Sequence, residues 1–432
     1  MTTIFALSVV ATLSWAWTGG VDQLGLPYGP GTDPTVTFPG RPLSPLPERR
    51  PAAEPGGREI PGPPTVGRGA AAPGASVIPS VSGSPTPGAR TSRPGPEQTT
   101  LARPESPAAQ PAAGSCRTGR KLVPSCGVLW GVAPGAFTDD RGRAALAAFE
   151  RKTERHQDIF HAYHRGNRQL FPTKNEMAIA REPGRERILF LNWKPAGASW
   201  AKIAAGDPAT DAFLDRLAKH LNRDFREQFF FTVHHEAEDN VREKKGSGYT
   251  ARDYSAMFRY VVNRLRAHGA DNMVTVLVHM AYVPHTSKSW FDTMYPGNDV
   301  VDWIGFDTYA YSDPGYGHGD LAELLNRQSS ARPNWPGFYN WATAKHPNKP
   351  LMVAEWGVWS SKKNPGHKAA FYREVGEQIR RFPRIRAMVH FDTPHNQDGR
   401  DSRVDATRES LAAYQKLGQL PIFQVNVAHA FP

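Results

Sequence analysis

Short apolar runs and longer amphipathic stretches alternate along residues 126–417. The bodies of the apolar runs carry almost no charge, which is typical of strands that are buried on both faces of a parallel sheet. Eight such runs are present, at residues 126–133, 158–164, 187–195, 229–240, 272–281, 301–310, 350–359 and 385–393.

Helix-like stretches fill most of the gaps between these runs. They lie at residues 139–156, 208–223, 250–269, 319–327, 368–381 and 408–417. In the third, Thr250 is a candidate N-cap and Gly269 a candidate C-cap. Eight strands separated by helices predict an α/β fold, the (β/α)8 TIM barrel, over residues 116–432. A doubly wound open sheet is the alternative, and it is disfavoured because no glycine-rich phosphate loop follows an early strand.

The first 115 residues have a different pattern. Residues 21–115 hold 21 of the 39 prolines and no lysine. This Pro/Gly/Ser-rich composition predicts a disordered linker, because it offers too little apolar surface to offset the entropy of ordering. Residues 4–17 are apolar and shorter than the roughly 20 residues of a membrane span, so residues 1–20 are interpreted as a signal peptide or a membrane anchor. Together these segments predict a secreted protein, or one that is anchored through residues 4–17.

Cysteine content and charge add two expectations. Cys116 and Cys126 are the two cysteines of the chain; they would form a disulfide in an oxidising compartment and remain free thiols otherwise. The formal net charge is +11, which is compatible with a polyanionic partner. The basic residues are scattered rather than clustered, so we expect a solvated basic surface, no nucleic-acid partner and a monomer.

Polar and aromatic residues gather at the carboxyl ends of the predicted strands, where a TIM barrel carries its active site. Two of them are glutamates, Glu236 on the fourth strand and Glu355 on the seventh. These strands face each other across a barrel mouth, and such a pair suits glycoside hydrolysis with retention, in which one carboxyl protonates the leaving oxygen and the other attacks. For Glu355 taken alone, a structural salt bridge is the alternative. The other residues at strand ends are Trp193, Lys194, His234, His235, Asp307, Tyr309, Trp356, Phe391 and Asp392.

Three segments resemble glycoside hydrolase family 26, a β-mannanase-like family within the clan of (β/α)8 retaining glycosidases. They are FTVHHEAEDN at 231–240, VDWIGFDTY at 301–309 and VAEWGVW at 353–359, and WGV at 130–132 fits the opening strand of the family. The resemblance spans roughly residues 126–417. It implies that the chain is an endo-β-mannanase-like hydrolase of polysaccharides.

The resemblance also implies roles for individual residues. Glu236 would be the acid/base and Glu355 the nucleophile. His235 would shape the subsite of the attacked sugar, and Tyr309 would donate a hydrogen bond to Glu355. Further substrate contacts are expected from Trp356, Asn240 and Trp193, with barrel core as the alternative for Trp193.

One departure bears on the substrate. Typical mannanases of the family follow the acid/base with Met, Asn, Gly and a tryptophan-rich stretch, whereas this chain has AEDNVREKKGSGY after Glu236. The family also includes enzymes for mixed-linkage β-glucan and β-1,3-xylan, so the expected partner is a β-linked polysaccharide or oligosaccharide. The altered loop also motivates an alternative function, a non-catalytic carbohydrate-binding protein on the same barrel.

Other chemistries find little support in the residues. His161, His164, His234 and His235 could suggest zinc, but no H-E-x-x-H is present, and we expect neither a metal nor another cofactor. No G-x-S-x-G elbow or P-loop occurs. Asp302 and Asp307 are further candidate carboxylates, and we expect at least one of them to be structural.

Overall fold

The computed structural model describes residues 116–427, apart from 137, 139–140, 314–317, 330–331 and 397–398. The predicted signal or anchor segment (1–20) and linker (21–115) lie outside the described residues. Within the described part, no helix has both the length and the hydropathy that a membrane span requires.

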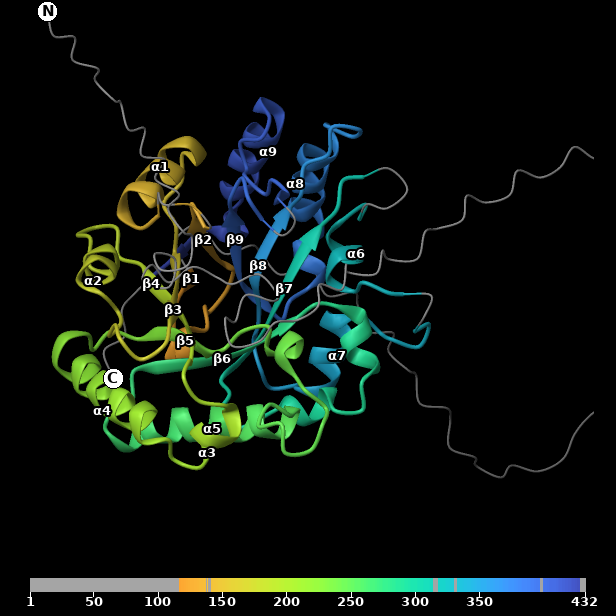
Figure 1. Cartoon of the computed structure of the whole chain (residues 1–432). Helices are drawn as coiled ribbons and strands as arrows, with labels where there is room; N and C mark the ends of the chain where they lie inside the picture. Colours follow the sequence, from red (N-terminus) through yellow and green to blue (C-terminus); the bar gives the residue numbers. More distant parts are fainter. Residues whose placement is uncertain are drawn as a thin grey trace, which may run out of the picture. The chain divides into compact units, whose positions relative to one another are not determined.

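Eight parallel strands close into a barrel in chain order, from β2 to β9 (Figure 1). They are β2 (Leu129–Pro134), β3 (Ile159–Arg165), β4 (Ile188–Lys194), β5 (Phe229–Val233), β6 (Met273–Met280), β7 (Trp303–Ala310), β8 (Leu351–Val358) and β9 (Ile385–Asp392). The (β/α)8 fold and all eight predicted strands are therefore confirmed. β5 ends at Val233, whereas the predicted strand covered residues 229–240. It is shorter because the chain turns sharply at His234.

Helices surround this barrel. They are α1 (Arg143–Thr153), α2 (Lys174–Ala180), α3 (Trp200–Ala204), α4 (Pro208–Asp224), α5 (Ala251–Ala267), α6 (Leu321–Leu325), α7 (Phe338–Lys345), α8 (His367–Gln378) and α9 (Arg408–Gly418). Thr250 caps α5 as predicted, and its hydroxyl accepts a hydrogen bond from the Asp253 amide. α5 ends at Ala267, and its C-cap is His268, one residue before the predicted Gly269. Gly269 follows the cap with a φ of 83°.

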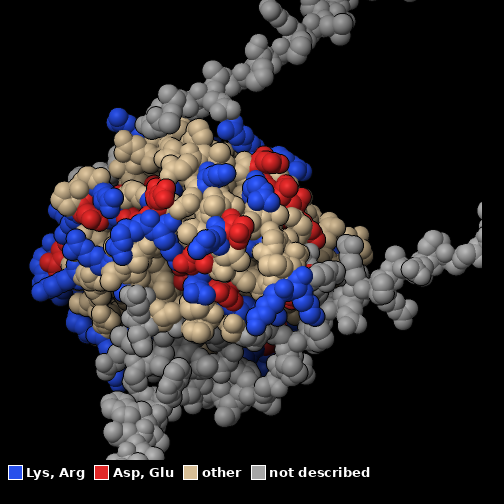
Figure 2. Space-filling model, turned by 90° about the horizontal axis from the view of Figure 1, so that it is seen from above, with Lys and Arg blue, Asp and Glu red and all other residues tan. Residues whose placement is uncertain are grey.

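Two hydrophobic layers hold the barrel together. Outward-facing strand residues pack against the helices; α5, for example, buries Tyr254, Phe258, Val261 and Leu265, which repeat at helical spacing. Inward-facing residues, such as Ile188, Phe230 and Met352, fill the barrel interior. The face of Figure 2 shows Lys and Arg interspersed with Asp and Glu, as the scattered charge in the sequence indicated.

The amino ends of the strands are closed by the first and last described segments. β1 (Cys116–Arg117) pairs in parallel with β10 (Val425–Asn426), and a disulfide joins Cys116 to Cys126, which confirms that expectation. Next to it, η1 (Arg120–Leu122) inserts the buried Leu122 under the barrel. This closure leaves the carboxyl ends of the strands as the open mouth.

Candidate active site

A strained turn presents the first glutamate at the mouth. β5 ends at Val233, and His234 and Glu236 then adopt left-handed backbone conformations, with φ of 54° and 50°. Residues other than glycine rarely adopt this conformation, and such strain persists only where the surrounding structure enforces it. The turn is followed by η2 (Ala237–Asn240), so Glu236 is its N-cap residue.

His234 holds this turn in place through hydrogen bonds at both of its ring nitrogens. Its Nδ1 accepts a hydrogen bond from Trp200 Nε1 at 3.1 Å, so Nε2 carries the proton and donates to Asn240 Oδ1 at 2.9 Å. Lys194 Nζ also donates to Asn240 Oδ1, at 3.2 Å. Burial holds the pKa of His234 well below its usual value, so the ring is neutral. The hydrogen bonds at the two nitrogens therefore position His234 and Asn240, which lie before and after Glu236 in the chain.

Glu355 is held by two tyrosines. Tyr163 donates to Oε1 at 2.6 Å and Tyr309 donates to Oε2 at 2.7 Å. The predicted contact from Tyr309 is present, and Tyr163 supplies a second one on the other oxygen. Each carboxylate oxygen has a donor, and this fixes the orientation of the group across the barrel mouth.

A break in strand register aims Glu355 inward. The pairing of β8 with β9 shifts between Val353 and Trp356, and the pairing of β7 with β8 shifts at Asp307. Ala354 belongs to the barrel interior, and Glu355 follows it into the mouth while Trp356 faces outward. Such irregularities re-aim side chains near active sites.

Burial and neighbouring charges separate the pKa values of the two glutamates. Burial raises the pKa of Glu355 to about 7, although the hydrogen bonds from Tyr163 and Tyr309 oppose the rise. Glu236 has a pKa well above its usual value because it is buried and lies near Glu355, Asp239 and Glu238. The two tyrosine hydrogen bonds therefore favour the ionised form of Glu355, whereas the carboxylates around Glu236 favour its neutral form.

His235 directly precedes Glu236 in the sequence and faces Glu355 in space. Its Nδ1 contacts Asn192 Nδ2, and its Nε2 lies 3.6 Å from Glu355 Oε1. Burial, with the charge of Lys194, lowers the pKa of His235 to about 3. A neutral ring that accepts from Asn192 keeps its proton on Nε2, directed toward Glu355.

Asp307 is a third carboxyl group at the mouth. Burial and the charges of Glu355 and Glu236 raise its pKa well above the usual value, which favours its neutral form. One ligand atom each of His235, Asp307 and Glu355 lies within 4.8 Å of the others, a set that could hold a cation. A cation there would occupy the carboxylate that the two tyrosines orient. Asp302 is structural, because it accepts from Lys121 Nζ at 2.5 Å under the barrel.

Two predicted sugar contacts are wrong. Trp356 is 0% exposed and packs outside the barrel against Trp130, Tyr414 and His390, where no sugar can reach it. Trp193 is also 0% exposed; it stacks on Phe213 of α4, so the barrel-core alternative is the correct one. The register shift at β8 turns Trp356 outward, and Trp193 alternates with the inward-facing Asn192.

Trp359, the residue that follows β8, is largely covered. It is 4% exposed, because Tyr309 stacks on it at 5.2 Å between ring centroids. The Arg400 guanidinium lies 4.5 Å from its ring centroid and 4.8 Å from that of Tyr311. Asn240 remains at the mouth, where its side-chain oxygen already accepts from His234 and Lys194.

Sequence reasoning missed Tyr163, whereas Asp307 was among the candidate carboxylates at the strand ends. Tyr163 stands second to last in the run 158–164, and its place near a strand end was the available signal. His161, the neighbouring inward residue, stacks on Phe190 and its Nδ1 lies 3.0 Å from the Tyr163 hydroxyl. His164 instead faces outward and pairs with Glu176 of α2 at 3.1 Å.

Comparison with known proteins gives a family match. Residues 205–328 match the family model of glycosyl hydrolase family 26. Endoglucanase H of Acetivibrio thermocellus is 27% identical over 235 residues, which are 53% of this chain and 24% of that protein. Beta-1,3-xylanase TXYA of a Vibrio species is 38% identical over 68 residues, 16% of this chain and 15% of that protein. The matches thus span a quarter or less of these relatives' lengths.

Solved structures that are similar to this chain include a GH26 beta-mannanase from Bacteroides ovatus. It aligns with a TM-score of 0.48 at 15% identity, over 71% of this chain and 91% of that chain.

Proposed function

The chain carries a glycosyl hydrolase family 26 sequence over residues 205–328, and from this premise we propose that it hydrolyses a β-linked polysaccharide with retention of configuration. The observation that carries the proposal is the carboxylate of Glu355, which two tyrosine hydroxyls orient at the barrel mouth near Glu236, a second glutamate whose pKa burial and neighbouring carboxylates raise. Paired carboxyl groups of unlike pKa are what acid-assisted glycoside cleavage requires.

In the first step Glu355 attacks the anomeric carbon through one carboxylate oxygen. Protonated Glu236 donates its proton to the glycosidic oxygen as the bond to the leaving sugar breaks. The product is a glycosyl ester on Glu355, and Glu236 becomes ionised. The Tyr163 and Tyr309 hydroxyls orient the nucleophile for this attack.

In the second step Glu236 acts as a base. It removes a proton from a water molecule, whose oxygen attacks the anomeric carbon and displaces Glu355. Two inversions give net retention, and both glutamates return to their starting protonation states. Neutral His235, with Nε2 directed toward Glu355, would contact the sugar held between them.

The substrate class proposed is β-mannan or a related β-glucan or β-xylan, cleaved internally. Relatives named as an endoglucanase and a beta-1,3-xylanase support β-linked glycans in general. The proposal includes export, supported by the apolar residues 4–17 and by the Cys116–Cys126 disulfide, a bond typical of oxidising compartments. It also includes action as a monomer.

A substrate panel tests the proposal. Reducing-sugar release is measured for the full chain on β-mannan, galactomannan, mixed-linkage glucan, β-1,3-xylan and β-1,4-xylan. Glu355→Ala should abolish release, whereas Glu377→Ala, a change of an exposed glutamate on α8, should not alter it. If no polymer is cleaved but one binds, the non-catalytic alternative replaces the proposal.

Azide distinguishes the roles of the two glutamates on an aryl β-glycoside of the sugar that the panel identifies. With Glu236→Ala, azide should replace water in the second step and give a β-glycosyl azide. With Glu355→Ala, azide should attack directly and give the α-azide. The opposite pairing of variants and products would contradict the assignment.

A further inference from the structure

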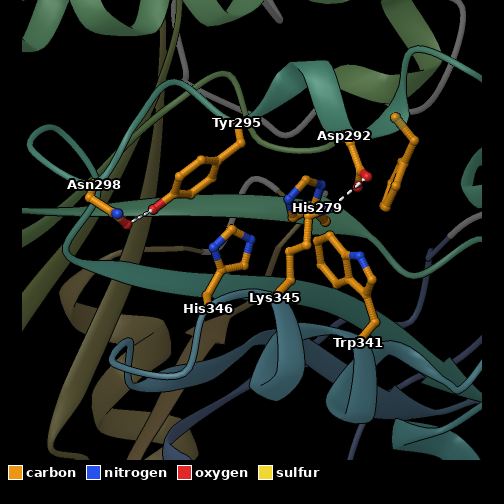
Figure 3. Close-up of a pocket in the computed structure, with 8 residues that line it drawn as sticks. His279, Asp292, Tyr295, Asn298, Trp341, Lys345 and His346 are labelled. Atoms are coloured by element: carbon orange, nitrogen blue, oxygen red, sulfur yellow. Dashed lines mark hydrogen bonds and ion pairs between the residues drawn. The ribbon is translucent and has the colours of Figure 1, made fainter.

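A cavity of about 210 Å³ lies outside the barrel, between the end of β6, η4 (Phe291–Met294) and α7. Figure 3 shows Trp341 beside His279 and Tyr295 beside His346 in its walls. The cavity is smaller than the roughly 300–1,000 Å³ of sites for drug-sized ligands, so it suits a ligand of a single ring.

His279 lines the cavity, and its ring nitrogen Nε2 lacks a hydrogen-bond partner among the described residues. The side chain is 2% exposed, and Nδ1 lies 2.6 Å from Glu238 Oε1. Nε2 is buried and has no hydrogen-bond partner among the described residues. A buried polar atom of this kind is costly unless a ligand or water reaches it. Because Nδ1 faces a carboxylate, Nε2 offers a lone pair to a hydroxyl group in the cavity.

Aromatic rings form the walls. Trp341 is half-buried and meets His279 edge to face, with ring centroids 5.3 Å apart. Tyr295 packs on His346 at 4.3 Å between ring centroids. Burial lowers the pKa of His346 to about 4, so this ring is neutral. Flat apolar surfaces next to hydroxyl-binding atoms match the two kinds of surface that a pyranose presents.

The rim carries no net charge. Lys345 Nζ pairs with Asp292 Oδ2 at 2.7 Å, and both side chains are about half exposed. Asn298 accepts from the Tyr295 hydroxyl at 2.7 Å through Oδ1, which leaves its amide hydrogens facing outward as donors. This balance disfavours an ion and favours a neutral ligand with hydroxyl groups.

We propose that this cavity is a second carbohydrate site, which binds one neutral sugar ring outside the barrel mouth. This proposal rests on the proposed function, because the sugar would be a product of hydrolysis or the terminal residue of the polysaccharide substrate. Trp341 is the stacking platform, His279 Nε2 accepts from a hydroxyl, and Asn298 donates at the rim. The opposite side of the His279 ring holds Glu238, whose Oε2 accepts from the Met280 amide at 3.3 Å, so the site adjoins the turn that presents Glu236.

Saturation-transfer NMR with the full chain tests this site, with D-mannose, D-glucose and D-xylose as probes. We expect at least one to bind with a millimolar Kd. Trp341→Ala should weaken that binding about tenfold, the loss of one ring's stacking, while Trp341→Phe retains most of it. Trp290→Ala is the matched control, because Trp290 is a nearby half-buried tryptophan that does not line the cavity. Asn298→Ala, at the exposed rim, repeats the test if Trp341→Ala unfolds.

Hydrolysis of the active polymer is measured for the same variants. Loss of sugar binding with retained hydrolysis supports a separate site. No binding of any probe to the wild type, or equal binding by Trp341→Ala, overturns the site while leaving the proposed function intact. Sugar binding that depends on Trp341 in a chain that cleaves no polymer would instead overturn the proposed function.

Discussion

Glu355 accepts a tyrosine hydroxyl on each carboxylate oxygen, from Tyr163 and Tyr309. These bonds stabilise its ionised form, whereas Glu236 has burial and three nearby carboxylates that favour its neutral form. The proposed assignment of Glu355 as nucleophile and Glu236 as acid rests on these different neighbours.

Removing one tyrosine hydroxyl should move the pH dependence of catalysis. Tyr309→Phe removes a hydrogen bond to ionised Glu355, so the pKa of Glu355 should rise above about 7. The acid limb of kcat/KM, which reports ionisation of the nucleophile, should shift upward by about one pH unit. The measurement is a pH profile on the active substrate.

Tyr260→Phe is the control for this change, because its hydroxyl bonds Asp211 on the outer helices. The control profile should overlay the wild type. An unshifted acid limb in Tyr309→Phe would mean that another group sets that limb.

Site residues could be predicted from the sequence only where a chemically suitable side chain also stands at a predicted strand end. Glu236, Glu355 and Tyr309 stand at strand ends within family-like segments, and the structure brings them to one mouth. Trp356 was assigned to the sugar site from the resemblance, but it directly follows Glu355 on β8, and adjacent residues of a strand face opposite sides. The position of Tyr163 depends on how β3 faces β8 across the barrel, which no local pattern encodes.

At the scale of elements, a buried ion pair joins α1 to the entry of β4. Arg187 is 1% exposed and Glu150 6%, with Arg187 Nη2 2.8 Å from Glu150 Oε2 and Nε 3.2 Å from Oε1. Glu150 Oε1 also accepts from the Gln157 amide at 2.8 Å, at the turn that leads into β3. One carboxylate thus connects α1 with the segments that lead into β3 and β4.

Breaking this pair should destabilise the fold. Arg187→Met leaves Glu150 buried without its main partner, and we expect a loss of about 3–5 kcal/mol in the free energy of unfolding, measured with urea. The double variant Glu150→Gln/Arg187→Met should recover part of it. Equal stability of the single variant and the wild type would show that Glu150 finds other compensation.

The same pair has a pH signature. Burial raises the pKa of Glu150, but hydrogen bonds from His156 and Arg187 outweigh it and lower the pKa to about 2. A lowered folded-state pKa contributes stability above the ordinary value of 4.5, and this contribution is lost as the pH falls toward about 2. The double variant should lack that part of the acid sensitivity.

The strands were predictable because each is a continuous apolar run, and burial on both faces requires that pattern. The short helices α2, α3 and α7 were missed; they span seven, five and eight residues, too few turns to show an amphipathic period. α2 begins with a capping box between Thr173 and Glu176, a local signal that could have located it.

At the scale of the whole molecule, stability and chemistry occupy opposite ends of the barrel. The disulfide, the β1–β10 pair and Leu122 close the amino ends of the strands, and the glutamates lie at the carboxyl ends. This separation is usual for TIM barrels.

Removing the disulfide should therefore lower stability without changing chemistry. Cys116→Ser/Cys126→Ser opens a short loop, and we expect the free energy of unfolding to fall by about 2–3 kcal/mol, seen as a lower Tm. Activity at 25 °C should equal that of the wild type. Reduction of the wild type should reproduce the Tm shift, and a fall in kcat at 25 °C in the folded double variant would contradict the separation.

The pairing of Cys116 with Val425 also has a practical consequence. The two ends of the folded region are neighbours on the side away from the cleft, so either can be coupled to a bead, a filament or another catalytic module. Under the proposed function, a chain immobilised there would present its barrel mouth to an insoluble polysaccharide. Several copies fixed in one orientation could then work along the same fibre.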